Sequence, residues 1–556
     1  MKRSIPVLIF LFSSLVMKAQ TYGHEWINHD QTYLRFYLTA NSLYRIDQET
    51  LDAAVTASGF SLASIDPRNF QLFYMGEEQY IHVEGESDGV FDATDFIEFY
   101  GQRNDGVFDA QLYNNPDDQV HQYSSLFTDT AAYYLTWNSS LENRRMETLV
   151  NDLTGVPASE THYEFNTLWV NGSATTILYG GGNFSPGRPY LDIYASTYDV
   201  GEGYTDTRFA NATRTRSVAA TNMYWGADRF QPYLRTAVIA TNEVPHHYTI
   251  SVNSNVLKDT SFTGFAFTRY EFELDTIFAT NPVAFSSLES STDFIRHCYI
   301  ELIYSRIWDF NNASKVGFKL VNSPHATKYL VVTDFNERST SPLLYDFDAH
   351  KRLVGIIDGS TSKFHVPYDA GGDRVYLSSQ DTLDIPYISS MELVSFVDFG
   401  SLANQGDFLI LTHNELRTDS TGTDWVQAYA DYRASPAGGS HDVVIVDIED
   451  LYESFSYGIR KHPLAIRNFS LFAVDSFSIS PDYLFIIGKA RRYDAARNST
   501  TIYAANYVPT FGSPGSDLLL TARPGTYIPL IPTGRLVAYS GDEVRRYYDK
   551  VTEFEL

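Results

Sequence analysis

The chain has 556 residues and a formal net charge of −27 at pH 7. Such an acidic surface repels nucleic-acid phosphates and anionic lipid faces, so we expect no nucleic-acid partner. The single cysteine, Cys298, excludes an intramolecular disulfide framework, and a chain that is 44% hydrophobic must be stabilised by burial.

Residues 1–20 have the layout of a secretory signal peptide. Lys2 and Arg3 precede an apolar core from Ile5 to Val16, and Ala19 offers a cleavage point. The apolar core is shorter than the roughly 18 residues that a membrane-spanning helix needs, and no later run reaches that length. We therefore expect an exported chain without a membrane span, outside the cell or held at the surface by something that it does not encode.

From about Thr32 to Phe399, short β-prone runs alternate with Asn, Asp, Gly and Ser. This spacing predicts an amino-terminal β-rich domain at 21–150 and a β-sandwich-like region at 151–400. A small helix is expected to begin near Leu51. The first part of the chain should therefore be mainly β.

The densest acidic cluster follows the spacing of a calcium-binding loop. With Glu84 as position 1, oxygen-bearing side chains fall at positions 1, 3, 5, 9 and 12, namely Glu84, Glu86, Asp88, Asp92 and Asp95. The ligand types fit less well, because Glu occupies positions 1 and 3 and Asp occupies position 12. Two interpretations stay open, a calcium site or a plain hairpin turn at Asp88–Gly89.

His297 and Cys298 are the one place where an imidazole and a thiol adjoin in sequence. Neighbouring residues of a strand point to opposite faces of the sheet, so the two side chains should diverge. We expect Cys298 to join Ile300, Leu302 and Tyr304 in one apolar stripe, as a buried cysteine that packs like a small hydrophobe.

Residues 401–556 alternate short apolar runs with segments of helical period. The runs predict buried strands at 408–412, 443–446 and 483–487, and the periodic segments predict helices at 424–434 and 463–473. Strands separated by crossover helices are typical of a doubly wound parallel sheet.

Ligands of such sheets lie beyond the carboxyl ends of the strands. The loops after Thr412, Val446 and Ile487 are therefore expected to border any site.

Several motifs are specific enough to suggest a family. They are DLYESFSYGI (450–459), HPLAIRNF (462–469), YLFIIGK (483–489), VPTFGSPGSD (508–517) and, upstream, GHEWIN (23–28), FIEFYG (96–101) and SLFTDT (125–130). The chain resembles a gingipain-type (family C25) cysteine peptidase, of the sortase-like branch associated with type IX secretion in Bacteroidetes. This resemblance implies that 401–556 is the first half of a caspase-like α/β peptidase domain.

The resemblance also says which residues would act. Members of the family cleave peptide bonds with a His-Cys dyad that follows the segment matching Gly534–Glu555, so no residue of this chain is assigned a catalytic role. Asp517 matches an acid that can bind the substrate residue before the cleaved bond. The apolar residues Leu518–Leu520 that follow depart from that pattern and put a preference for basic residues in doubt.

Two functions remain open at this stage. The first is an exported peptidase that cleaves or transfers secreted cargo at the cell surface, with polypeptide substrates and secretion-system components at the outer membrane as partners. The second is a non-enzymatic, β-rich binding or adhesion protein with a degenerate peptidase half-domain. Half a sheet would leave an apolar edge and one face uncovered, so we expect the natural protein to continue beyond Leu556.

Overall fold

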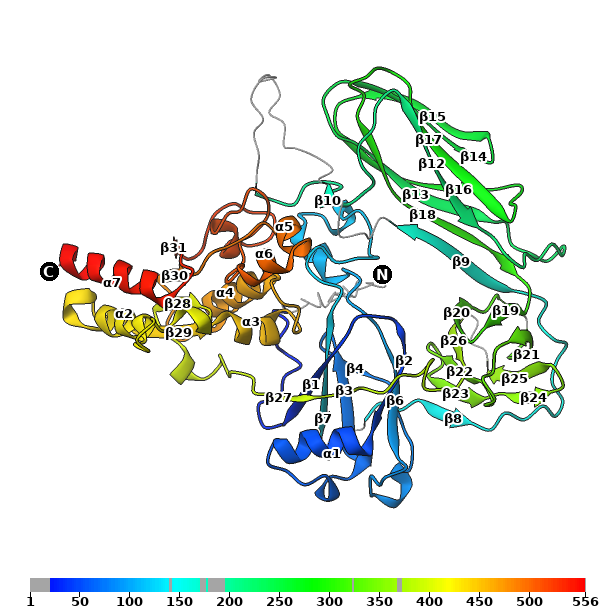
Figure 1. Ribbon diagram of the computed structural model, residues 1–556, viewed down its shortest axis with the longest axis horizontal. Coiled ribbons are helices and arrows are strands. Elements are labelled where there is room, and N and C mark those ends of the chain that lie inside the picture. The colour runs from blue at the N-terminus through cyan, green and yellow to red at the C-terminus, as the bar shows by residue number, and fades with distance from the viewer. Residues whose placement is uncertain are drawn as a thin grey trace, which may run out of the picture.

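The computed structural model describes residues 21–139, 143–170, 177–178, 196–322, 325–367 and 373–555. The predicted signal peptide, 1–20, lies outside the described residues. Figure 1 shows two β-sandwiches on one side, an α/β domain on the other and an amino-terminal β unit between them. The predicted fold class, a mainly β region followed by a parallel α/β domain, is confirmed.

The amino-terminal unit packs two small antiparallel sheets and a helix. Its elements are β1 (Tyr33–Leu38), β2 (Ser42–Asp47), α1 (Gln48–Ala57), β3 (Phe70–Tyr74), β4 (Glu77–Gln79), β5 (His82–Val83), β6 (Phe96–Gly101) and β7 (Ala131–Trp137). The helix predicted near Leu51 is α1, which begins after Asp47 because that side chain accepts a hydrogen bond from the backbone N–H of Thr50 at 2.8 Å.

The middle of the chain forms two sandwiches. Their elements are β8 (Glu147–Leu149), β9 (Tyr163–Val170), β10 (Ile177–Leu178), β11 (Gly203–Tyr204), β12 (Ala212–Ala219), β13 (Tyr233–Ala240), β14 (Pro245–Val252), β15 (Asn255–Thr263), β16 (Ala266–Glu273), β17 (Thr280–Ser287), β18 (Ile295–Arg306), β19 (Asp309–Ala313), β20 (Lys315–Lys319), β21 (Thr327–Phe335), β22 (Leu343–Asp346), β23 (Lys351–Val354), β24 (Ile356–Asp358), β25 (Thr361–Pro367) and β26 (Arg374–Ser378).

One nine-stranded sheet, in the order β16-β13-β18-β9-β20-β26-β22-β23-β8, runs through both sandwiches. The sheet β12-β17-β14-β15 covers its first half, and the sheet β19-β21-β25-β24 covers its second half. Strand β27 (Glu392–Val394) then returns to the amino-terminal unit and pairs with β1. The region predicted at 151–400 therefore exchanges strands with the unit before it.

The α/β domain is built on four parallel strands in the order β29-β28-β30-β31. Its elements are β28 (Phe408–Thr412), α2 (Trp425–Ala434), β29 (Val443–Asp447), α3 (Ile448–Phe455), α4 (Leu464–Ser476), β30 (Tyr483–Ile487), α5 (Tyr493–Arg497), α6 (Thr500–Ala504), β31 (Thr533–Leu536) and α7 (Gly541–Glu555). No helix among the described residues is both long and apolar enough to cross a membrane.

Both faces of this sheet are covered. Phe408 and Ile410 pack with α2 and α7 on one face, while Leu409 and Leu411 pack with α3 and α4 on the other. The expectation of an uncovered face was therefore wrong, because α3 and α7 were not foreseen as covering helices.

The α3–α4 layer is itself buried beneath the rest of the chain. Residues 108–127 of the amino-terminal unit and Tyr198 and Tyr204 share one apolar core with α3 and α4. Polar contacts cross the same boundary: Tyr134 donates to Glu453 at 2.5 Å, and His462 lies 3.2 Å from Asp109 with both side chains fully buried. The loops of the α/β domain are therefore held against a fixed neighbour.

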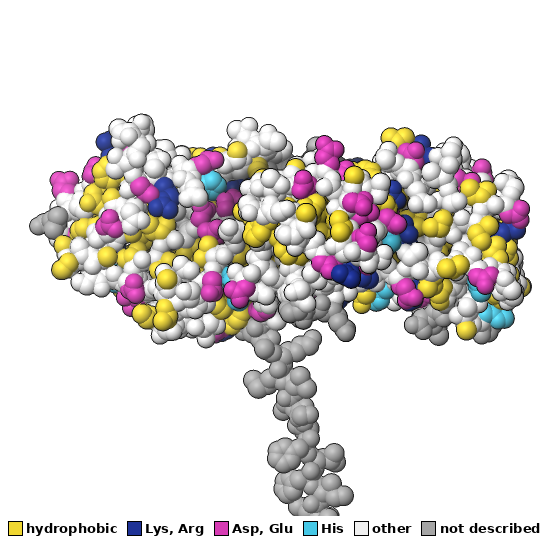
Figure 2. Space-filling model, turned by 90° about the horizontal axis from the view of Figure 1, so that it is seen from below, with side chains coloured by type: hydrophobic (Ala, Val, Ile, Leu, Met, Phe, Trp, Pro, Cys, Tyr) yellow, Lys and Arg dark blue, Asp and Glu magenta, His cyan; other side chains and the backbone are white. Residues whose placement is uncertain are grey.

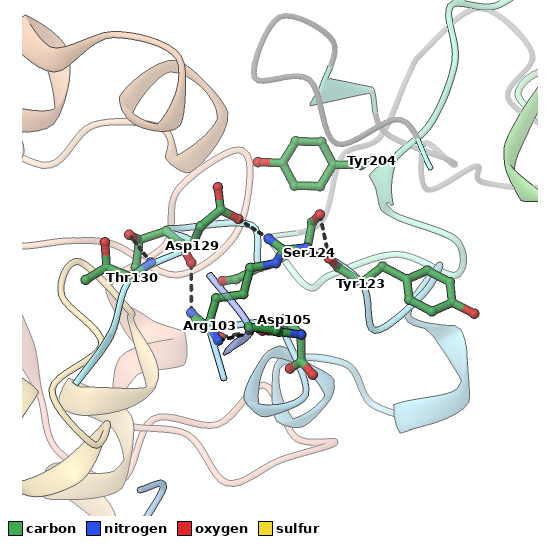
Figure 3. A network of polar contacts seen from close by, with 12 residues as sticks. Arg103, Asp105, Tyr123, Ser124, Asp129, Thr130 and Tyr204 are labelled. Carbon is green, nitrogen blue, oxygen red and sulfur yellow. Dashed lines mark hydrogen bonds and ion pairs between the residues drawn. The ribbon is translucent and has the colours of Figure 1, made fainter. Parts of the chain in front are cut away.

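A second set of contacts joins all three parts of the molecule. Asp129 accepts from Arg103 at 2.8 Å, as Figure 3 shows, and pairs with Arg497 of α5 at 2.6 Å. Arg497 also donates to the Tyr204 hydroxyl at 2.9 Å. Tyr493 of α5 donates to Glu202, and burial raises the pKa of Glu202 to about 8.

The molecular surface agrees with the acidic composition. Figure 2 shows Asp and Glu side chains spread over one face, with Lys and Arg scattered between them. On this face the positive charge does not gather into a patch of the kind that binds nucleic acid.

We expect Glu98→Gln to destabilise the fold by about 3–5 kcal/mol. Glu98 is fully buried and accepts from Arg45, Arg352 and Tyr345 at 2.7–2.9 Å, which joins the amino-terminal unit to the second sandwich. Burial opposes its ionisation, but the two guanidinium groups outweigh that effect and hold its pKa below the ordinary value. Urea unfolding of the full chain measures the loss.

The matched control is Glu147→Gln. Glu147 also pairs with a basic residue of β23, Lys351, but its side chain is 62% exposed, so the loss should stay below about 1 kcal/mol. Equal losses in the two variants would contradict the stabilising role assigned to the buried cluster.

We expect Glu202→Gln to change how stability depends on pH. With a folded pKa of about 8 and an unfolded value of about 4.3, Glu202 holds its proton in the folded state over a range where the unfolded chain releases it. The parent should therefore lose stability as the pH rises from about 5 to 8, and the variant should lose less. Thermal unfolding across this range measures the difference. If stability falls with pH equally in the parent and in Glu202→Gln, the prediction is refuted. The control is Glu289→Gln, which changes an exposed glutamate and should behave like the parent.

Candidate functional site

The carboxyl edge of the parallel sheet gathers ionisable side chains from several loops. His413 directly follows β28, and Asp447 ends β29 and caps α3, where its Oδ1 accepts from the N–H of Glu449 at 2.9 Å. Burial raises the pKa of Asp447. The loops after Thr412 and Val446 thus supply the groups that the sequence placed near a site.

Glu449 lies between two basic groups at this edge. Its carboxylate is 3.6 Å from His413 Nε2 and 3.3 Å from an Arg460 nitrogen. His413 Nδ1 accepts a hydrogen bond from the N–H of Glu415, so Nε2 is the ring nitrogen that carries a proton toward Glu449. The backbone N–H of Glu415 therefore orients the imidazole, and the Glu449 carboxylate lies near its Nε2.

Lys461 is the most unusual residue of the cluster. It is 7% exposed, its ammonium lies 5.9 Å and 5.7 Å from the ring centres of Tyr452 and Tyr503, and burial lowers its pKa. Its φ of 63° and the φ of 55° at Tyr457 are both in the left-handed region, so the loop between α3 and α4 is strained.

The carboxyl edge thus combines Asp447, whose pKa is raised, the oriented imidazole of His413, and Lys461, whose pKa is lowered. Clusters of ionisable groups with shifted pKa values are common at functional sites. Together the three side chains can bind polar or charged groups of a ligand. A thiol nucleophile is not among them.

The single cysteine lies far from this edge in the sequence and in another part of the fold. Cys298 is on β18 of the first sandwich, is fully buried beside Val120 and Ile239, and burial raises the pKa of its thiol. His297 points to the other face, where its ring stacks on Phe285 and contacts Trp169. The two side chains diverge, and the thiol is a core group.

One detail of that strand was predicted wrongly. The pairing of β13 with β18 shifts between Thr236 and Val238, so Ala237 faces both Cys298 and Tyr299 in a β-bulge. The extra residue moves Cys298 off the stripe formed by Ile300, Leu302 and Tyr304, which packs in the sandwich core, and places it on the opposite face.

Asp517 lies at the carboxyl edge, held by Arg535. The two Asp517 oxygens accept from Arg535 at 2.7 Å each, and Thr510 adds a bond at 2.9 Å. Arg535 also donates to the carbonyls of Gly488, Val508 and Pro509 at 2.8–3.1 Å. The carboxylate thus anchors the loop that follows β30, and its role toward a substrate stays a prediction.

The acidic loop of 84–95 connects two paired strands, β5 and β6, as a hairpin would. Its carboxylates contact separate partners: Glu84 with His82, Glu86 with Arg145, Asp88 with the N–H of Val90, Asp92 with the N–H of Thr94, and Asp95 with the N–H of Asp92. Within the described ranges, no three His, Cys, Asp or Glu side chains are grouped to hold a metal ion. Calcium binding stays a prediction from spacing alone.

Sequence reasoning found the loops at the carboxyl edge but not the side chains in them. His413, Glu449 and Lys461 were not singled out, although His413 follows the first predicted strand directly. The signal that could have found His413 is its position in the loop directly after a buried strand. The pairing of Glu449 with Arg460 across a strained loop has no local signature.

Comparisons with known proteins support the resemblance found in the sequence. Residues 401–556 match the family model of peptidase family C25. The crystal structure of dimeric latent PorU from Porphyromonas gingivalis matches with a TM-score of 0.57 and 14% identity, over 94% of this chain and 49% of that chain. The isomalto-dextranase of Arthrobacter globiformis T6 gives a TM-score of only 0.15 at 11% identity, over 49% of this chain and 34% of that chain, so no conclusion rests on it.

No curated protein matches the chain. The chain spans about half the length of the PorU structure, and at this identity the likeness shows a shared fold. The predicted resemblance to gingipain-type C25 peptidases is confirmed by the family match and by this fold.

We expect Arg535→Met to destabilise the α/β domain by about 3–5 kcal/mol, because Asp517 would lose its charged partner and three carbonyls would lose a donor. Asp517→Asn, which keeps an acceptor, should cost about 1–2 kcal/mol. Arg523→Met is the matched control, since its pair with Asp475 is 39% exposed at the arginine and should contribute below about 1 kcal/mol. Unfolding monitored by near-UV circular dichroism measures the loss of stability in each variant. Arg535→Met should lose the most, and an Arg535→Met protein as stable as Arg523→Met would contradict the prediction.

Proposed function

We propose that this chain is part of an exported gingipain-like cysteine peptidase of the type IX secretion sortase-like kind, which cleaves or transfers secreted cargo at the cell surface. The observation that carries the proposal is the match of residues 401–556 to peptidase family C25. The fold shared with PorU along 94% of the chain supports it.

The chemistry proposed is acyl transfer through a thiol. A cysteine thiolate attacks the peptide carbonyl, a histidine moves the protons, and backbone N–H groups stabilise the oxyanion. Release of the acyl group to water gives proteolysis, and release to an amine gives transfer of cargo. We assign neither dyad residue within this chain, because a buried thiol of raised pKa, such as that of Cys298, cannot act as a nucleophile.

We propose that this chain contributes the rim of the site. In this proposal His413, at the carboxyl edge, would contact polar groups of a polypeptide, whereas the buried Lys461 would act through its charge. Asp517 is kept as a candidate substrate-binding residue, with one adjustment. Because Arg535 donates to both carboxylate oxygens of Asp517, Asp517 would shape the wall of the pocket and would not pair with a basic substrate side chain.

The second candidate function is a non-enzymatic, exported β-rich binding or adhesion protein with a degenerate peptidase half-domain. The inaccessible Cys298 favours it. Secretion-system partners at the outer membrane are compatible with either function.

We expect the chain as given to show no thiol-dependent cleavage of peptide libraries, and Cys298→Ala to behave like the parent. A thiol reagent such as DTNB should leave Cys298 unmodified in the folded protein and react once in denaturant, since the side chain is fully buried. Cleavage that disappears in Cys298→Ala would overturn this assignment.

A genetic experiment separates the two candidate functions. The gene is deleted in the source bacterium, and the secreted and surface proteins are analysed by mass spectrometry. A peptidase or sortase role predicts cargo that retains its uncleaved terminal segment. Normally processed cargo would reject that role and favour the binding protein.

A further inference from the structure

A groove lies where the amino-terminal unit meets the second sandwich, away from the α/β domain. Its volume is about 530 Å³, within the usual range of small-molecule sites. Segments of β4, β6, β20, β22 and β26 line it, so the amino-terminal unit and the second sandwich both form its walls.

Aromatic rings make up much of the lining. Tyr100 lies between Phe347 and Tyr376, with ring centres 4.6 Å and 5.1 Å away. Across the boundary between the two units, Tyr80 stacks on His350 with ring centres 3.5 Å apart. Tyr80, Tyr100 and Phe347 are only half-buried, so apolar surface of the rings remains accessible to a ligand.

Polar groups with spare hydrogen-bonding capacity stand beside these rings. The hydroxyls of Tyr80 and Tyr100, the side-chain amide of Gln102 and the carboxylate of Glu77 line the groove and make no hydrogen bond to any described residue. They offer both donors and acceptors.

The charges of the lining cancel. Arg144 donates to Glu78, through its backbone N–H to the carboxylate and through its guanidinium to the carbonyl. Arg374 forms its ion pair with Asp348. The lining residues themselves include two carboxylates, Glu77 and Glu78, and two guanidinium groups, Arg144 and Arg374, so their formal charges balance, which favours a neutral ligand over an anion or a cation.

The backbone offers little to an extended peptide here. Of the strands that line the groove, β6, β20, β22 and β26 are paired with neighbours on both sides. The three-residue strand β4 ends its sheet and is the one lining strand with an open edge, which is too short to hold an extended peptide by strand addition. Recognition must come from side chains.

We propose that this groove binds a short neutral oligosaccharide. A sugar ring presents C–H faces that pack on the negative faces of aromatic rings and hydroxyls that need donors and acceptors around them. The groove supplies both, without net charge. This binding site is separate from the proposed peptidase edge and does not depend on it.

To test this proposal, the full chain is titrated with cellotriose, maltotriose and chitotriose, and binding is measured by saturation-transfer NMR and calorimetry. Trigalacturonic acid and a tyrosine-containing pentapeptide are the comparison ligands. We expect at least one neutral trisaccharide to bind, Tyr100→Ala to abolish that binding, and Gln102→Ala to weaken it about tenfold. Tyr527→Ala, on an exposed tyrosine of the α/β domain, should bind like the parent.

Gln102 is exposed, so its variant keeps the test valid even if Tyr100→Ala fails to fold. The proposal is overturned if no neutral trisaccharide binds at millimolar concentration. It is also overturned if only the anionic sugar or the peptide binds, or if Gln102→Ala binds as tightly as the parent.

Discussion

The structure depends on how the α3–α4 layer of the parallel sheet is covered. A parallel sheet must bury both faces, and here α2 and α7 cover one face while α3 and α4 cover the other. The outer side of the α3–α4 layer is also apolar and lies against residues 108–127 of the amino-terminal unit. The α/β domain and the β-rich region therefore share one core, which fixes the orientation of the loops at the carboxyl edge.

Two buried ionisable groups at that boundary, Glu453 and His462, avoid an isolated charge in different ways. Glu453 is paired with Arg35 and accepts from Tyr134, which offsets the burial that raises its pKa. His462 is different: burial lowers its pKa, Nδ1 accepts from the N–H of Leu464, and the remaining proton on Nε2 faces Asp109. Each arrangement avoids the cost of an isolated buried charge, which reaches several kcal/mol. Such contacts specify one docking geometry among many that apolar packing alone would allow.

The part of the chain that matches the peptidase family and the part that carries the thiol are different parts of this molecule. The parallel sheet, its family match and the fold shared with PorU belong together, yet the only thiol lies in a sandwich core on β18. His413, Glu449 and Lys461 give the carboxyl edge a cluster of ionisable groups that contains no thiol. Because a fold can host many functions, the proposed peptidase role rests on the family match, and the sugar-binding role rests on the aromatic groove.

The sequence by itself determined the strands and helices whose patterns are local. The predicted strands 408–412 and 483–487 are β28 and β30 to the residue, since a short continuous apolar run fits a strand buried on both faces. The sequence also predicted that the loops after Thr412 and Val446 border any site, and ionisable side chains gather in these loops. Only the tertiary structure decided the bulge at Cys298, the pairing of Asp517 with Arg535, the cluster around Glu98 and the groove beside Tyr100. These features join residues distant in sequence, and local periodicity cannot report which side chains meet after packing.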